Sequence, residues 1–133
     1  MLTGHCFCEK IQYEVSQDID TLVFCHCSRC RRESASAYNA IASIPATTLT
    51  ITQGKSDINT YSANGTDRHF CGNCGSQLFS EGPHSPGMYY FRVGTLTTDI
   101  HPERKLHIFA GSKANWDDIC DNLPVFDEMP TSQ

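Results

Sequence analysis

Seven of the eight cysteines in this chain fall into three short clusters. Thiols this close in sequence can converge on one ion with little movement of the backbone, and thiolates are common ligands of zinc. Two pairs and one triple predict one ion held by four thiolates and another held by three. Four protein ligands close a structural site, whereas three leave a position for water or substrate, as in catalytic zinc sites. The clusters are Cys6-Phe-Cys8, Cys25-His-Cys27-Ser-Arg-Cys30 and Cys71-Gly-Asn-Cys74.

The segment Cys71-Gly-Asn-Cys74-Gly has the form of a zinc knuckle. In such a turn the backbone N–H groups point at the sulfur atoms, and we expect Gly72 and Gly75 to supply conformations that other residues reach only with strain. Those hydrogen bonds offset the negative charge of a thiolate-rich site. The first cysteine pair is expected to complete this site and to tie the N-terminus to the middle of the chain. Four buried free thiols are the competing interpretation, and they fit these spacings less well.

The triple cluster places three thiols within six residues, with no fourth cysteine nearby. A metal bound there is expected to keep an open position for water or an incoming thiol. Metal binding deprotonates a thiol and holds it as a nucleophile at neutral pH. Arginines in a turn are ordinarily solvated, but beside an open metal site they could bind the carboxylates of an anionic thiol substrate. These arginines are Arg29, Arg31 and Arg32.

Three other interpretations of the triple cluster stay open. It could be a closed structural site with His5, His26 or His69 as the fourth ligand, although His26 in an extended chain would point away from Cys25 and Cys27. It could also be a redox dithiol, or it could hold no metal. We rank the open metal site first, the closed site second, and the redox or empty cluster third.

Length and composition limit the classes of protein that this chain can be. Its 133 residues predict one domain, and 39% hydrophobic residues with a mean hydropathy of -0.36 fit a soluble protein. No apolar run reaches the ~20 residues that a membrane helix needs. The N-terminus lacks a signal-peptide pattern, so we expect a cytoplasmic protein, in which clustered thiols bind metal rather than form disulfides. A net charge of -5 without a Lys/Arg run argues against nucleic-acid and membrane partners.

The elements that must position these clusters are predicted to be short β-strands. Ile11, Tyr13 and Val15 alternate with polar residues, and β-branched and aromatic runs are bounded by Gly, Pro, Asn and Ser. This pattern predicts a small all-β fold. The predicted strands cover residues 11–15, 22–24, 38–44, 49–51, 58–61, 68–70, 77–80, 88–93 and 106–109.

Helix is expected in two short segments only, over 29–33 and over 116–123. In the second segment, four apolar side chains share one helix face, which accounts for the eighth cysteine without assigning it to a metal. The last residues of the chain are expected to be frayed. The side chains on the predicted helix face are Trp116, Ile119, Cys120 and Leu123.

A few other side chains could carry chemistry. Tyr89, Tyr90 and Trp116 are interpreted as core or rim aromatics rather than substrate platforms. Three histidines have no partner that the sequence assigns, and such residues are usually structural or on the surface. They are His84, His101 and His107.

Taken together, these motifs resemble a known family, the glutathione-dependent formaldehyde-activating enzymes, which also includes centromere protein V. The resemblance spans residues 3–126, nearly the whole chain, and rests on the order and spacing of seven cysteines. The motifs are Gly4-x-Cys6-x-Cys8, Cys25-His-Cys27-x-x-Cys30-Arg, Phe70-Cys71-x-x-Cys74-Gly and His107-Ile with Trp116.

The resemblance implies an Mss4-like fold, which is small and mainly β, with twisted antiparallel sheets stapled by two zinc ions. It implies a carbon-sulfur lyase similar to S-(hydroxymethyl)glutathione synthase, which joins glutathione to formaldehyde. The partners would be a small-molecule thiol, such as glutathione, and formaldehyde or a related aldehyde. The structural zinc would be held by Cys6, Cys8, Cys71 and Cys74, and the catalytic zinc by Cys25, Cys27 and Cys30.

Two features depart from the family pattern. Glu9 directly follows the second cysteine of the first pair, where family members often have Gly. The segment between Cys30 and Cys71 is short, which leaves less chain for a dedicated glutathione pocket. The alternative to an enzyme is a zinc-stabilised protein-binding module without catalysis, which a closed, four-ligand second site would favour.

Overall fold

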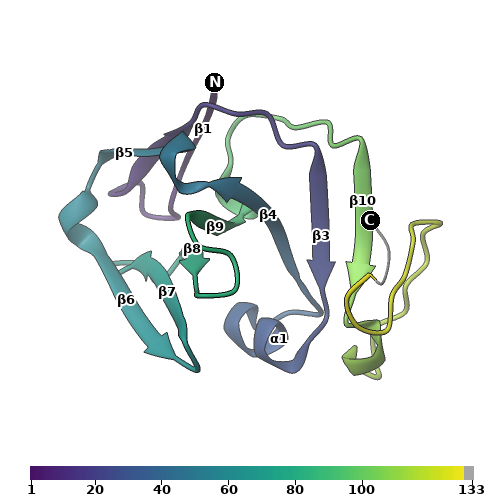
Figure 1. Cartoon of the computed structure of the whole chain (residues 1–133). Helices are drawn as coiled ribbons and strands as arrows, with labels where there is room; N and C mark the ends of the chain where they lie inside the picture. The colour runs from purple at the N-terminus through teal and green to yellow at the C-terminus, as the bar shows by residue number, and fades with distance from the viewer. Residues whose placement is uncertain (131–133) are drawn as a thin grey trace. The chain divides into compact units, whose positions relative to one another are not determined.

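The structure, a computed structural model shown in Figure 1, describes residues 1–130. These residues form two compact units. The first unit comprises residues 1–19 and 42–101, and the second comprises 20–41 and the described residues from 102 on. None of the helices in these residues is long and apolar enough to cross a membrane. The single domain expected from the chain length stays a prediction, and the fraying expected of the last residues lies outside the described part of the chain.

A three-stranded antiparallel sheet in the first unit has the order β1-β2-β5. The alternation predicted around β2 is confirmed, because Ile11, Tyr13 and Val15 are all buried. No strand was predicted for the segment that forms β1, which is short and carries Thr, Gly and His. The strands are β1 (Leu2–His5), β2 (Gln12–Val15) and β5 (Leu49–Gln53).

The remaining strands of the first unit belong to a second sheet, with the order β9-β8-β7-β6. Strands β6 and β7 form a hairpin whose two-residue loop, Asn64-Gly65, has φ values of 55° and 76°. This is the loop sequence that a tight hairpin turn favours. The elements are β6 (Ile58–Ala63), β7 (Thr66–Cys71), β8 (Gln77–Glu81) and β9 (Met88–Arg92), with short 3₁₀ turns η1 (Ala46–Thr48), η2 (Lys55–Asp57) and η3 (Val93–Thr95).

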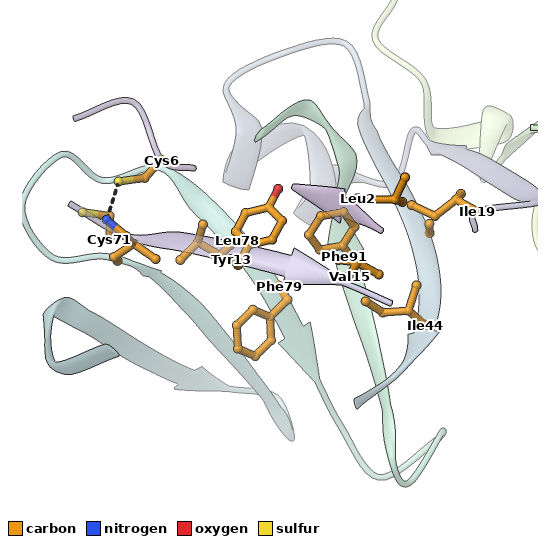
Figure 2. Packing of buried hydrophobic residues seen from close by; sticks show 12 residues of the cluster. Leu2, Cys6, Tyr13, Val15, Ile19, Ile44, Cys71, Leu78, Phe79 and Phe91 are labelled. Atoms are coloured by element: carbon orange, nitrogen blue, oxygen red, sulfur yellow. Dashed lines mark hydrogen bonds between the residues drawn. The ribbon is translucent and has the colours of Figure 1, made fainter. Parts of the chain in front are cut away.

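The hydrophobic core of the first unit includes cysteine sulfur atoms. Figure 2 shows Cys6 and Cys71 at one end of this core and Leu2 and Ile19 at the other. Tyr13 packs edge-on against Phe91 with ring centroids 5.4 Å apart. Because two of the ligand side chains are part of the packed interior, the positions of these sulfur atoms depend on the fold of the whole unit.

The second unit is built around the parallel pair β3 (Thr21–Cys25) and β10 (Arg104–Ile108). On its other side, β3 pairs antiparallel with the first residues of β4 (Asn39–Pro45). The later residues of β4, from residue 42 on, belong to the first unit. A small core forms around Cys25, Leu106 and Ile108. The predicted turn of helix is found as α1 (Ser28–Ser34), and a 3₁₀ turn η4 (Ala110–Ser112) follows β10. The predicted mainly β fold is therefore confirmed and is consistent with an Mss4-like fold.

The helix predicted over 116–123 is wrong, because this segment is irregular and both Trp116 and Cys120 are exposed. Asp121 explains the difference. One of its oxygens accepts the Leu123 backbone N–H at 3.1 Å, and the other lies 2.9 Å from His107 Nε2. The hydrogen bonds of Asp121 to the nearby backbone and to a strand residue compete with the hydrogen bonds of a helix. A helix of eight residues is also stable only when it packs against other parts of the protein.

Candidate metal centres

Four cysteines from two distant segments of the first unit converge in the structure. All four sulfur atoms lie within 4.8 Å of one another. The Cys6 and Cys8 sulfurs are 3.6 Å apart, and those of Cys8 and Cys71 are 3.8 Å apart. Tetrahedral zinc with bonds of ~2.3 Å requires sulfur atoms roughly 3.8 Å apart, so the donor set fits this ion. We call Cys6, Cys8, Cys71 and Cys74 the four-cysteine cluster.

Backbone N–H groups point at the sulfurs of the four-cysteine cluster. The Ile11 N–H donates to Cys6 Sγ and the Cys74 N–H donates to Cys71 Sγ, and the nitrogen–sulfur distance is 3.4 Å in both bonds. Burial raises the pKa of the Cys6 thiol to about 11, so its thiolate is costly without a cation nearby. These contacts and this burial are what a metal-thiolate site requires, because the ion's positive charge offsets the ligand charge.

The turns around the four-cysteine cluster differ in part from the expectation. Gly75 has a φ of 83°, as predicted, but Gly72 has no left-handed φ. A Cβ at position 72 would lie 2.8 Å from Nδ2 of Asn59, so a larger residue there requires the exposed Asn59 side chain to move. Glu9, where the family often has Gly, has a φ of 65°. The departure from the family pattern therefore places a non-glycine residue in a conformation that favours glycine.

Three cysteines converge in the second unit, at the junction of β3 and α1. Cys25 ends β3, Cys27 is the N-cap of α1, and Cys30 lies in its first turn. Their sulfur atoms lie within 4.8 Å of one another, and Cys27 Sγ accepts the Cys30 backbone N–H at 3.3 Å. Cys27 thus uses its sulfur as the capping acceptor that Ser or Asp usually supplies. We call these residues the three-cysteine cluster.

The three thiols are too close to ionise independently. Hydrogen bonds from Cys25 and then Cys30 lower the pKa of Cys27 to about 2, and the reciprocal contact with Cys27 raises that of Cys25 to about 11. The same two neighbours raise the pKa of Cys30. Negative charge therefore gathers on one sulfur, and a cation is needed for all three to be thiolates.

Within the described part of the second unit, no further Cys, His, Asp or Glu joins the three-cysteine cluster. His26 lies between two of these cysteines but is fully buried, with its Nε2 2.8 Å from His107 Nδ1. The prediction that its side chain points away is confirmed. The other two proposed fourth ligands bond inside the first unit, His5 to the Cys6 carbonyl and His69 to Thr60 and Glu81.

A chain of hydrogen bonds behind the three-cysteine cluster was not predicted. A carboxylate only accepts, so His107 Nε2 donates to Asp121, and Nδ1 of the same ring is hydrogen-bonded to His26 Nε2 at 2.8 Å. His26 Nδ1 lies 3.7 Å from Asp117 Oδ2 and has no hydrogen-bond partner among the described residues. The parallel register of β3 and β10, which aligns Phe24 with His107, creates this network. No local sequence signal reveals such a register between strands that are more than 80 residues apart.

The three arginines next to the three-cysteine cluster lie on α1 in different environments. Arg29 and Arg32 are exposed, and Arg32 Nη1 donates to the Ser28 carbonyl at 3.4 Å. Arg31 is half-buried, and its Nε is buried without a hydrogen bond to any residue that the structure describes. Of the three, Arg31 is therefore the arginine whose unpaired donor is buried.

None of the eight cysteines forms a disulfide, so the alternative of a disulfide scaffold is not supported. Cys120 lies outside both clusters and is exposed, with its thiol 3.5 Å from the Asp118 carbonyl. The structure therefore contains two cysteine clusters that can hold metal ions, one with four ligands and one with three.

Comparison with known proteins agrees with this arrangement. The chain is 27% identical over 128 residues to a Halomonas elongata protein named "Putative glutathione-dependent formaldehyde-activating enzyme", covering 90% of this chain and 81% of that protein. A crystal structure of a Rhodobacter sphaeroides protein matches the fold with a TM-score of 0.61 at 23% identity, covering 73% of this chain and 89% of the other. The family profile described as "Glutathione-dependent formaldehyde-activating enzyme" matches residues 1–112. The resemblance seen in the sequence is thus confirmed, and the chain belongs to the glutathione-dependent formaldehyde-activating enzyme family.

Proposed function

We propose that this protein is a zinc-dependent carbon-sulfur lyase of the S-(hydroxymethyl)glutathione synthase type, which joins glutathione or a similar thiol to formaldehyde or a related aldehyde. The observation that carries the proposal is the three-cysteine cluster, which gathers three ligands and no fourth from the described residues of its unit. Reduced thiols at both clusters fit a reducing compartment, and we assign the protein to the cytoplasm on that ground.

The proposed reaction adds a thiol to a carbonyl group. The sulfur attacks the carbonyl carbon and forms the C–S bond, the π electrons of the C=O bond move to oxygen, and this oxygen takes up the proton that the thiol lost. Zinc bound at the three-cysteine cluster would supply the positive charge that lowers the pKa of a thiol placed at its open position.

The residues of the chain orient the reactants. Cys27 is held by its capping bond to the Cys30 backbone, and His26 anchors the backbone between Cys25 and Cys27 through its bond to His107. The open side of the cluster thereby keeps a fixed geometry, which is what an open catalytic metal site needs. We assign Arg31 to a carboxylate of the thiol substrate, because its buried Nε has no other described partner and a carboxylate would satisfy it. Arg29 and Arg32 add positive charge on the same short helix.

The test measures how fast glutathione and formaldehyde exchange with their adduct, since the reaction also proceeds without an enzyme. Two-dimensional exchange NMR at equilibrium gives this rate without stopping the reaction. We expect zinc-loaded protein to raise it above the protein-free rate, Cys27→Ser to lose the gain, and Cys120→Ser to keep it. No gain for the zinc-loaded protein, or equal rates for it and Cys27→Ser, would remove the lyase assignment and leave the zinc-stabilised binding module.

A further inference from the structure

The first unit contains a cavity of about 460 Å³ that the proposed lyase chemistry does not use. It is lined by residues of β5, η2, β6, β7, β8 and β9. A volume of 300–1,000 Å³ is usual for sites that bind small molecules. Its side chains therefore decide what class of ligand it could take.

An aromatic stack lines one part of this cavity. The rings of His69 and Phe79 have centroids 4.6 Å apart, and those of Phe79 and Tyr89 are 4.3 Å apart, each pair tilted by 33°. The aliphatic side chains Ile51 and Ile58 also line the cavity. A surface of stacked rings and branched aliphatic groups favours a flat, apolar ligand body, because ring stacking adds to the burial of apolar area.

The orientation of the stack is fixed at His69. Its Nδ1 lies 2.8 Å from Thr60 Oγ1 and its Nε2 lies 2.8 Å from Glu81 Oε2. Both ring nitrogens are thus already paired across three neighbouring strands. The stack is preorganised, which reduces the cost of ordering it when a ligand binds.

Lys55 and Tyr89 are among the polar lining residues whose side chains have no partner among residues 1–130. Lys55 makes no ion pair or hydrogen bond there, although the chain as a whole has a net charge of -5. The Tyr89 hydroxyl also has no hydrogen bond, and burial, followed by the charge of Glu81, raises its pKa and keeps it a donor. An unpaired cation and an unpaired hydroxyl donor both fit the carboxylate of a ligand.

The charge of the cavity limits the ligand further. Glu81 also lines it and already accepts a hydrogen bond from His69. A ligand with two negative charges would find one lysine to pair with, and its second charge would be repelled by the Glu81 carboxylate. A ligand with one negative charge can be paired by the lysine alone. We propose that this cavity binds a small aromatic monocarboxylate, with its ring on Phe79 and Tyr89 and its carboxylate at Lys55.

The test titrates the zinc-loaded full-length protein with indole-3-acetate, followed by amide ¹H–¹⁵N NMR. We expect saturable shifts concentrated on the elements that line the cavity, with the largest shifts on η2, β8 and β9. The neutral analogue indole-3-acetamide should bind about fivefold more weakly, as expected for the loss of one partly exposed ion pair. Saturable binding with this preference supports the proposal, and shifts that do not saturate or that lie outside these elements overturn it.

Variants assign the binding to the cavity. Lys55→Met removes the charge but keeps the aliphatic stem, and it should weaken indole-3-acetate about fivefold while leaving indole-3-acetamide unchanged. Lys105→Met, an exposed lysine of the second unit, is the matched control and should change neither affinity. Tyr89→Phe keeps the ring and should weaken the carboxylate about threefold. Equal effects of Lys55→Met on both probes, or none on either, contradict the proposal. Because the readout is binding, its outcome is independent of the lyase test.

Discussion

The two cysteine clusters differ in where their ligands come from. The four-cysteine cluster joins a turn after β1 to a knuckle after β7, and two of its cysteines are part of the core of the first unit. The three-cysteine cluster is contained in a six-residue segment that runs from the end of a strand to the first turn of a short helix. A metal that joins distant segments contributes its binding energy to folding, whereas one held by a local segment adds little long-range restraint. We therefore expect the first site to support the fold and the second to support the chemistry.

The largest expected effect is on stability, at the four-cysteine cluster. Cys71→Ser removes a fully buried ligand, and we expect it to lower the free energy of unfolding by more than about 3 kcal/mol. Thermal unfolding followed by circular dichroism, with metal content by mass spectrometry, measures this. Cys120→Ser is the control and should melt like the unchanged protein. A Cys71→Ser protein with normal stability would mean that this site is not structural.

The second effect separates activity from stability. Cys27→Ser should abolish the rate gain in the exchange assay but cost far less stability than Cys71→Ser, because its cluster is local and half-buried. The loss of the capping sulfur is offset in part, since serine is itself a good N-cap residue. If Cys27→Ser unfolded the protein as Cys71→Ser does, the contrast between the two sites would be wrong.

A smaller, stabilising effect is expected at two residues with left-handed backbone conformations, one in each unit. Glu9 has a φ of 65° beside the four-cysteine cluster, and Ala35, with a φ of 50°, ends the helix that carries Cys30. Glu9→Gly and Ala35→Gly should each add up to about 1 kcal/mol to the free energy of unfolding, because glycine adopts this conformation without strain. Denaturant titration of both variants measures this. Destabilisation by either would mean that the native side chain makes a compensating contact.

The smallest expected effect concerns pH and the network behind the three-cysteine cluster. The hydrogen bond from His107 holds the pKa of Asp121 below its ordinary value of 3.8. Because the folded-state pKa is lowered, this stabilisation is complete above the unfolded pKa and is lost as pH falls through the folded value. Stability should therefore fall less steeply below about pH 4 in Asp121→Asn than in the unchanged protein. Chemical unfolding between pH 3 and pH 7 tests this, and parallel curves would contradict it.

The sequence was informative where the signal is local. The spacing of the cysteines predicted the three-cysteine cluster and each half of the four-cysteine cluster, and alternation predicted nine of the strands, because these depend on residues close in the chain. That the two halves share one site, although Cys8 and Cys71 are 63 positions apart, followed only from the need of each cysteine pair for a second pair. The helix over 116–123 failed because Asp121 pairs with a histidine on β10. The buried pair of His26 and His107 depends on a strand register, and the close approach of Asn59 to Gly72 depends on a neighbour from β6, so neither is visible locally.

The central claim, unequal sulfur ligation, is tested most directly by zinc X-ray absorption spectroscopy on protein loaded with two equivalents of zinc. We expect a sulfur shell at ~2.3 Å that averages between three and four ligands per ion, with a light-atom contribution near ~2.0 Å that lacks the signature of imidazole. Cys27→Ser loaded with one equivalent should show four sulfur ligands alone. In the unchanged protein, an imidazole signature or four sulfur ligands at both ions would contradict the account. Failure to retain a second ion would contradict it as well.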